Sequence, residues 1–345
     1  MKKLLVLLVV GLLAVTSLTG CAAPKTYKFG TGSYTTVSGK AAVAASTGVD
    51  AADGQVQVTT VYAAVLLDDA GKIVYVDIDA AQNKGTFDAT GAVVKAEAAP
   101  TKQEKGNDYG MKGASAIGKE WFEQIEALKA YFVGKTIEEI KAIEVYEKDA
   151  SHKAVPAGED LKTSVSISIE GYVAAVEKAV ANAVEVKGVA KVGVGSVASV
   201  SGKAAVAAAE GVDAAAGQIQ TNVTFTGVAF DKDGKVLVAL LDVAQNKGTF
   251  DATGAIVKAE AAPTKQEKGA DYGMKGASAI GKEWNEQANA LTAYFVGKTA
   301  DEVAAIAVDA EGVVTVEDLK TSVSVGIDEY LASFAKAVAN AVEVK

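Results

Sequence analysis

The sequence predicts an α+β fold in two tandem homologous domains, each a mostly antiparallel sheet packed with C-terminal helices. The first observation behind this prediction is an internal repeat: residues 82–121 recur at 245–284 and differ only at Val93/Ile256 and Asn107/Ala270. The second is the 163-residue spacing of the copies, which is the length of a domain and far longer than a solenoid repeat. The third is the order within each copy, where strand patterns come first and helical patterns follow.

The first 20 residues have the pattern of a lipoprotein signal peptide. Lys2 and Lys3 precede an apolar run too short to span a bilayer, and Leu-Thr-Gly-Cys ends it at Cys21. We therefore expect cleavage before Cys21, lipidation of that residue, a tether over 21–27, and domains over 28–188 and 189–345. This predicts a chain anchored in the lipid bilayer of the cell membrane, on its extracytoplasmic face. The alternative is a lone cysteine after an ordinary signal peptide.

Composition narrows the classes of partner and of chemistry. Cys21 is the only cysteine, so no disulfide within the chain and no catalytic thiol are expected. With 43 acidic against 34 basic residues the net charge is −9, and loss of Lys2 and Lys3 makes it more negative. Such a surface repels phosphate backbones, and no basic run with interleaved aromatic residues occurs. We expect no nucleic-acid partner.

Each copy opens with alternating small and β-branched residues and continues with two apolar runs around a turn. The runs are 56–68 and 73–79 in the first copy, and 223–230 and 235–242 in the second. Asp-Lys-Asp-Gly at 231–234 favours a hairpin turn, because Asp and Gly suit the backbone of tight turns. A calcium loop would require further ligands that this segment lacks.

Helical periodicity follows the strands. One apolar face runs through 121–132 and Gly134 ends it; its members are Trp121, Ile125, Leu128 and Phe132. Capping boxes that open a short second helix are expected at Thr136/Glu139 and Thr299/Glu302. A last amphipathic helix is expected over 171–184, with an apolar stripe formed by Tyr172, Val176, Val180 and Ala183.

The inventory of reactive side chains is poor. The only histidine, His152, lies in a stretch that the second copy shortens, so a shared active site cannot depend on it. We expect His152 to be an exposed loop residue. Haem ligation, His-based zinc binding and Ser-His-Asp catalysis lose an essential residue in at least one copy. With no Walker loop or Gly-x-Gly-x-x-Gly motif after a strand, we expect no catalytic residue and no metal site, and redox chemistry would require a bound cofactor.

The sequence Asp-Leu-Lys-Thr-Ser-Val-Ser occurs at 160–166 and again at 318–324, each time just ahead of the final amphipathic helix. It resembles the attachment sequence of the FMN-binding domain family, Asp-x-x-Ser/Thr-Gly-Ala-Thr/Ser before a helix rich in Ala and Val. In that family an exported flavin transferase moves FMN from FAD onto the last hydroxyl as a phosphoester. The resemblance implies two covalent FMN groups, on Ser166 and Ser324. The motif also makes cofactor-binding candidates of Asp160, Asp318, Thr163 and Thr321.

The match departs from the family pattern, because Ser-Val replaces Gly-Ala and Ser replaces the commoner Thr at the acceptor. The block at 108–121, Asp-Tyr-Gly-Met-Lys-Gly-Ala-Ser-Ala-Ile-Gly-Lys-Glu-Trp, is similar to a subgroup in which the variant attachment sequence is ordinary. That subgroup comprises the flavinylated, pheromone-precursor surface lipoproteins of Gram-positive bacteria. The resemblance implies extracellular electron transfer, an extracytoplasmic FAD:protein FMN transferase as modifying partner, and a membrane NADH dehydrogenase or quinol as electron donor.

Two other segments could be taken for the attachment sequence. Thr90-Gly91-Ala92 contains the Thr-Gly-Ala pattern, but Val93 follows where the acceptor hydroxyl should be. Gly113-Ala114-Ser115 ends in a hydroxyl, but Lys112 stands where the pattern requires Ser or Thr. Ser115 and its counterpart Ser278 therefore stay open as alternative acceptors.

A flavin ring would also need a wall to pack against. The aromatic residues present in both copies are Phe87/Phe250, Tyr109/Tyr272, Trp121/Trp284, Tyr131/Tyr294 and Tyr172/Tyr330. Burial on the helix stripes explains Trp121, Phe132 and Tyr172 without a cofactor. Tyr109 and Met111, with Tyr272 and Met274 in the second copy, lie in a glycine-flanked loop and are the better candidates for a flavin wall.

The function that these features favour is a membrane-anchored, extracytoplasmic electron carrier with two covalent FMN groups, which passes electrons to extracellular acceptors. This is a flavin-based electron-transfer protein rather than an enzyme with its own substrate turnover. The alternative is a non-redox surface lipoprotein, a binding or scaffold module and pheromone precursor. A hydrolase is disfavoured because no nucleophile and base recur in both copies.

Overall fold

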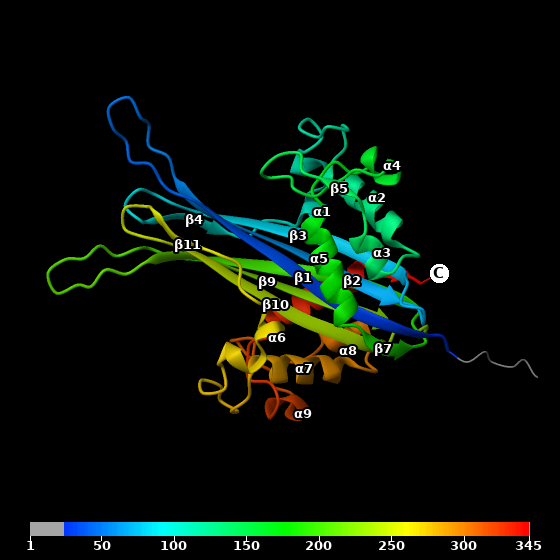
Figure 1. The fold of residues 1–345 in the computed structure, drawn as a ribbon. Coiled ribbons are helices and arrows are strands. Elements are labelled where there is room, and N and C mark those ends of the chain that lie inside the picture. Colours follow the sequence, from blue (N-terminus) through cyan, green and yellow to red (C-terminus); the bar gives the residue numbers. More distant parts are fainter. Residues whose placement is uncertain (1–23, 345) are drawn as a thin grey trace, which may run out of the picture.

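The computed structural model describes residues 24–344, so the predicted signal peptide and Cys21 lie outside the described residues. Within this range each copy of the repeat forms one five-stranded antiparallel sheet (Figure 1). The first sheet has the order β4-β3-β2-β1-β7 and the second the order β11-β10-β9-β8-β12. The strands of the first are β1 (Thr26–Lys40), β2 (Gly54–Leu67), β3 (Ile73–Phe87), β4 (Val93–Glu97) and β7 (Val184–Lys187). Those of the second are β8 (Lys191–Lys203), β9 (Gly217–Phe230), β10 (Val236–Phe250), β11 (Ile256–Ala259) and β12 (Val342–Glu343).

Helices cover the outer face of each sheet, which confirms the α+β prediction (Figure 1). The first half contains α1 (Lys102–Lys105), η1 (Gly106–Tyr109), α2 (Trp121–Phe132), α3 (Ile137–Lys141), α4 (Glu159–Lys162) and α5 (Glu170–Ala181), with a small hairpin of β5 (Val145–Tyr146) and β6 (Val155–Pro156). The second half contains α6 (Lys265–Lys268), η2 (Gly269–Tyr272), α7 (Trp284–Phe295), α8 (Ala300–Ala304), α9 (Glu317–Lys320) and α10 (Asp328–Ala339). Strand β1 begins at Thr26, inside the predicted tether, because Thr26 pairs with Lys187 of β7.

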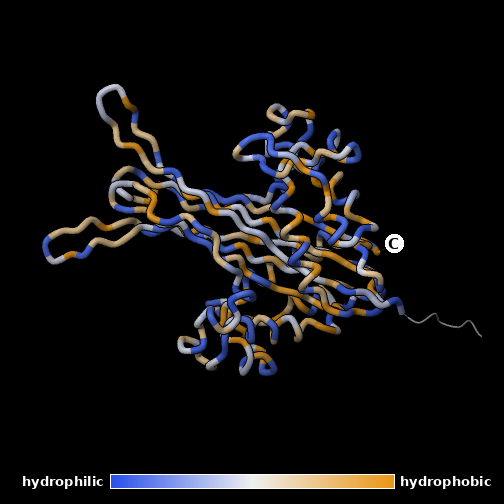
Figure 2. The backbone as a smooth tube through the Cα atoms, viewed as in Figure 1, coloured by the Kyte–Doolittle hydropathy of each residue, from blue (hydrophilic) through white to orange (hydrophobic). Residues whose placement is uncertain are grey.

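The inner faces of the two sheets pack against each other, so the molecule has four layers: helices, sheet, sheet and helices. Hydrophobic stretches concentrate in these sheets and helices (Figure 2). At one end of the seam, where β3 and β10 end, the rings of Phe87 and Phe250 stack at 3.8 Å and 3°, both fully buried. Each ring of this shared aromatic pair thus stacks on its counterpart from the other half and is part of the core.

Contacts across the seam are reciprocal, as in a twofold-symmetric dimer. The amide of Ala42 donates to the carbonyl of Gly254 at 2.9 Å, and the equivalent amide of Ala205 donates to Gly91 at 2.9 Å. Two ion pairs repeat the exchange, Lys178 with Glu267 and Lys336 with Glu104. The tandem copies thus associate as a symmetric pair within one chain.

Two glycines in β1 allow the last helix of the first half to lie directly on its sheet. A Cβ on Gly30 would come within 2.0 Å of the Ala179 carbonyl oxygen, and one on Gly32 within 2.4 Å of the Ala179 amide nitrogen. The helix contacts the strand through small residues, so the buried stripe of α5 consists of Tyr172, Ala175, Val176 and Ala179. Val180 and Ala183, at the C-terminal end of the predicted stripe, are half-buried and pack against the same core.

The remaining local predictions are confirmed. Helix α2 buries Trp121, Ile125, Leu128 and Phe132, and Gly134 follows it at φ +84°. Both predicted capping boxes form, at Thr136/Glu139 and Thr299/Glu302. Asp-Lys-Asp-Gly makes the β9–β10 turn, with Gly234 at φ +77°.

Two hairpin arms, residues 41–53 and 204–216, project beyond the sheets at the end opposite to the start of β1 (Figure 1). Their tips carry Val49 and Val212, each 48% exposed. Among residues 24–344 no helix has the length and apolar character needed to cross a bilayer.

Candidate functional site

The repeated Asp-Leu-Lys-Thr-Ser-Val-Ser segment forms the short helix α4 and the turn that follows it. Leu161 and Val165 point into the core and are 3% and 0% exposed. They hold the turn against the outer side of the domain and leave Ser166 partly exposed. The segment therefore leaves its last residue partly exposed, while Leu161 and Val165 before it anchor the turn.

A buried glutamine of α2 fixes the position of Ser166. The carbonyl oxygen Oε1 of Gln124 accepts from the Ser166 amide at 2.8 Å and from its Oγ at 3.3 Å. Gln124 is fully buried. Its Nε2 donates to the carbonyl of Lys119 at 3.1 Å and to Oγ of Ser115 at 3.1 Å. Every polar atom of this side chain thus has a partner, as a buried amide requires.

The same glutamine brings the two alternative acceptors together. The Oγ atoms of Ser115 and Ser166 lie 3.5 Å apart, although 51 residues separate them in the sequence. The two candidate attachment segments therefore form one site. The Ser115 hydroxyl also accepts from the amides of Ile117 and Lys119, each at 3.4 Å, so it stabilises its own loop. The Ser166 hydroxyl instead donates to Gln124.

The second half repeats this arrangement. Oε1 of Gln287 accepts from the Ser324 amide at 2.8 Å and from its Oγ at 3.3 Å, and Nε2 donates to Ser278 at 3.1 Å. In addition, Nζ of Lys282 lies 3.4 Å from Oγ of Ser322, two residues before Ser324. A cation thus lies beside the predicted acceptor segment of the second half.

The glycine-rich loop at 106–120 covers the site and is held by one carboxylate. The Glu120 side chain is 4% exposed and accepts from the amides of Met111 and Lys112 at 2.8 and 3.0 Å. Gly110 and Gly118 take positive φ angles of 73° and 63°, which a side chain would disfavour. Glu283 holds the equivalent loop of the second half in the same way.

The structure places both candidate wall residues in this loop, with contacts of their own. The Tyr109 hydroxyl faces Oε1 of Gln82 at 3.4 Å, and Nζ of Lys102 lies 4.8 Å from the Tyr109 ring centre. Lys102 also lies 5.5 Å from the ring of Trp121, so a nearly buried lysine sits between two aromatic faces. Burial raises the pKa of the Tyr109 phenol. Met111 is half-buried and packs against the core of its half, as does Met274 in the second half, where Tyr272 repeats the lysine contact with Lys265 at 4.9 Å.

Trp121 and Tyr172 are core residues, as predicted, and they bond to each other. The indole Nε1 of Trp121 donates to the Tyr172 hydroxyl at 2.7 Å, and Trp284 donates to Tyr330 at 2.8 Å in the second half. Burial raises the pKa of Tyr330 to about 12, so this phenol is protonated over the physiological range.

The other motif positions lie apart from the hydroxyl network. Asp160 and Thr163 are exposed on α4 and at its C-terminus, and Asp318 and Thr321 take the same places on α9. His152 lies in the loop between β5 and β6, with a side chain that is 44% exposed. It contacts Asp149.

Sequence reasoning missed Gln124 and Gln287. A signal was present, because Gln is identical in the two copies of this helix while its neighbours change, from Phe122 to Asn285 and from Ile125 to Ala288. A polar residue kept on an apolar stripe needs a buried partner. The unchanged glutamine of α2 thus indicated where this helix contacts the serine segment.

The Ser166 hydroxyl is held by one side-chain amide. Ser166 is partly exposed, and its hydroxyl is oriented by the Gln124 side-chain amide. A neutral amide cannot act as a base that would deprotonate this hydroxyl. Among the described residues no group of three His, Cys, Asp or Glu side chains is placed to bind a metal ion. The Ser166 hydroxyl lies beside the glycine-rich loop, through Ser115.

Comparisons with known proteins give one partial relationship. A curated protein named chlorophenol reductase, from Desulfitobacterium hafniense, is 38% identical over 100 residues, which cover 24% of this chain and 29% of that protein. The chain thus matches less than a third of the length of this relative. No protein family matches the chain. No solved structure matches it. The name of this relative is that of a redox enzyme, and the similarity covers only part of each chain.

Proposed function

We propose that this chain is a lipid-anchored, extracytoplasmic electron carrier with FMN attached covalently to Ser166 and Ser324. The observation that carries the proposal is the recurrence in both halves of one arrangement: a partly exposed serine hydroxyl, at the end of the same seven-residue segment, held by a buried glutamine.

Attachment would be a phosphoryl transfer. The serine oxygen bonds to the FMN phosphorus of FAD, the pyrophosphate bond breaks, AMP leaves and the serine proton is released. The base and the metal ion for this step would come from the extracytoplasmic flavin transferase. The part of this chain is to present the hydroxyl: Leu161 and Val165 anchor the turn, and Gln124 fixes the direction of the Ser166 Oγ.

Bound flavin would supply reversible acceptance of one or two electrons. The residues that would hold it are Ser166, the loop with Tyr109 and Met111, and the cation Lys102, with their counterparts in the second half. A covalent bond prevents loss of the cofactor by dilution outside the cell. The partial similarity to a protein named as a reductase supports a redox role, and the donor would be a membrane NADH dehydrogenase or quinol.

The test is co-expression with the flavin transferase, followed by flavin fluorescence in a denaturing gel and intact mass measurement. The wild-type chain should gain two groups, each one FMN minus one water, and Ser166→Ala or Ser324→Ala should each lose one. The matched control is Ser115→Ala with Ser278→Ala, which should keep both. Loss of flavin in this control alone would move the attachment to the alternative serines. A colourless wild-type chain in the presence of active transferase would favour the non-redox surface lipoprotein.

A further inference from the structure

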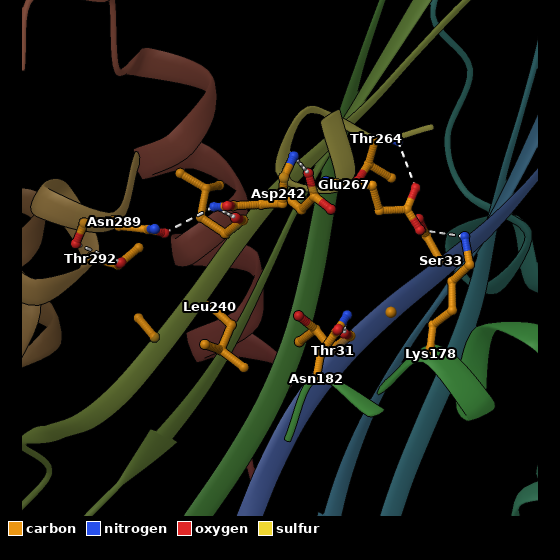
Figure 3. Close-up of a pocket in the computed structure, with 14 residues that line it drawn as sticks. Thr31, Ser33, Lys178, Asn182, Leu240, Asp242, Thr264, Glu267, Asn289 and Thr292 are labelled. Atoms are coloured by element: carbon orange, nitrogen blue, oxygen red, sulfur yellow. Dashed lines mark hydrogen bonds and ion pairs between the residues drawn. The ribbon is translucent and has the colours of Figure 1, made fainter. Parts of the chain in front are cut away.

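A cavity of about 280 Å³ lies at the seam between the two halves, and its lining includes none of the site serines (Figure 3). One wall comes from the first half, through Thr31 and Ser33 of β1 and Asn182 after α5. The other comes from the second half, through Leu240 and Asp242 of β10 and Thr292 of α7. Its volume equals that of about nine water molecules and lies near the lower end for ligand sites, so it suits a small molecule.

The cavity results from a difference between the two copies. In the first half the equivalent positions carry Asp77, Glu126 and Lys129, and Lys129 Nζ lies 2.8 Å from Asp77 and 2.6 Å from Glu126. In the second half these positions are Leu240, Asn289 and Thr292, which are shorter or uncharged. The ion-paired lysine that occupies this place in the first half has no counterpart in the second.

A second difference changes the partners of the acid in the cavity. Asp79 of the first half accepts from the Tyr62 hydroxyl at 2.9 Å, but Phe225 takes the place of that tyrosine in the second half and has no hydroxyl. Asp242 keeps the amide donors of Val243 and Gln266 at 2.7 and 3.0 Å. Burial raises the pKa of the Asp242 carboxyl to about 6, as expected for an acid without a compensating cation.

The rest of the lining indicates what could compensate Asp242. Lys178, the lysine that lines the cavity, pairs with Glu267 at 2.5 Å. Ser33 is 3% exposed, and its Oγ has no hydrogen-bond partner within residues 24–344. A carboxylate without its own cation and a buried hydroxyl without a partner both favour a ligand that donates hydrogen bonds and carries positive charge. Carboxylates of Asp242 and Glu267 disfavour an anion, and Leu240 provides an aliphatic surface.

We propose that this cavity binds a small aliphatic primary amine, with its ammonium group on Asp242 and the Ser33 hydroxyl and its carbon chain against Leu240. In the first half the Lys129 side chain fills the equivalent space, where it pairs with Asp77 and Glu126. The ligand would thus fill in the second half the space that this side chain fills in the first.

The test is ligand-observed NMR on the full mature chain with butylamine as probe and 1-butanol as its neutral control of similar size. Butylamine should bind saturably at pH 7.5, and 1-butanol at least about tenfold more weakly, because a charge-assisted contact is lost. Asp242→Asn should weaken butylamine binding by about tenfold or more. Lowering the pH to 5 should do the same by protonating Asp242, with Glu267 and Lys178 as the other charged groups that face it.

The decisive variant imports the first-half residues as Leu240→Asp, Asn289→Glu and Thr292→Lys. It should abolish butylamine binding while circular dichroism and the melting temperature show a folded chain. Thr292→Lys alone is the second variant should the triple change fail to fold. Equal binding of butylamine and 1-butanol, or wild-type binding by either filled variant, would overturn the proposal. The assay uses protein without flavin, so its outcome is independent of the proposed electron-transfer function.

Discussion

The buried glutamine of α2 leads to the sharpest structural prediction, for Gln124→Leu. The side chain is fully buried, accepts from the Ser166 amide and hydroxyl at 2.8 and 3.3 Å, and donates to Ser115 and to the Lys119 carbonyl at 3.1 Å. Leucine has a similar volume, so the change removes these bonds without leaving a large cavity. The Ser166 amide and the Lys119 carbonyl lose their partners, and each such loss costs about 1–3 kcal/mol. We expect a loss of about 2–4 kcal/mol in the free energy of unfolding.

The assay is urea unfolding followed by circular dichroism, with the m-value compared between variants to verify that the same transition is measured. Gln103→Leu is the matched control, because Gln103 is exposed on α1 and should change stability by no more than about 0.5 kcal/mol. Gln287→Leu should repeat the loss in the second half, where the same contacts recur. A loss below about 1 kcal/mol for Gln124→Leu would refute the view that this amide organises the serine site.

Three further predictions concern the core, the seam and pH. Gly32→Ala should destabilise the chain by at least about 1–3 kcal/mol, because the added Cβ would lie 2.4 Å from the backbone of α5. Gly113→Ala is the control and should be nearly neutral, because nothing lies within 4 Å of its Cβ. Equal melting temperatures for the two variants would contradict this prediction. Phe87→Ala should lower the free energy of unfolding by about 3–5 kcal/mol, because the stack on Phe250 is lost. A decrease below about 1 kcal/mol in urea unfolding would mean that the seam does not depend on these rings. The pKa of Asp242 is about 6 in the folded chain and about 3.9 when unfolded, so the folded state binds more protons and loses stability as pH rises from about 4 to 6. Asp242→Asn should remove this loss. Its free energy of unfolding, relative to wild type, should be higher at pH 7.5 than at pH 4 by on the order of 2–3 kcal/mol. The same difference between variant and wild type at both pH values, measured by urea unfolding, would contradict this prediction.

The repeat and the helical periodicity predicted the elements well, because these depend on nearby residues. How the two copies associate could not be read from the repeat, since identical modules can pack in many ways. A clue was present in β2, where 61–67 is continuously apolar and buried on both faces, as expected of a strand covered by helices on one side and by a second sheet on the other. The stack of Phe87 on Phe250 is a consequence of that packing.

The serine site was predicted in parts that the fold joins. Ser115 and Ser166 were competing candidates because each ends a segment that partly matches the attachment pattern. They are 51 residues apart, and only the packing of α2 shows that one glutamine contacts both. The close approach of α5 to β1 could not be read from the helix, because it depends on Gly30 and Gly32 in a strand that is distant in sequence. Asp160 and Thr163 came from the motif alone, and the structure places them exposed on α4.

Peptide mapping of the mature chain by mass spectrometry, after co-expression with the flavin transferase, tests the central claim most directly. Cleavage after lysine releases residues 163–178 and 321–336 with the predicted acceptors, and separates them from the identical peptides 113–119 and 276–282 that contain Ser115 and Ser278. The account predicts one FMN minus one water on Ser166 and one on Ser324. Unmodified peptides at both positions, or flavin on Ser115 and Ser278 instead, would contradict it.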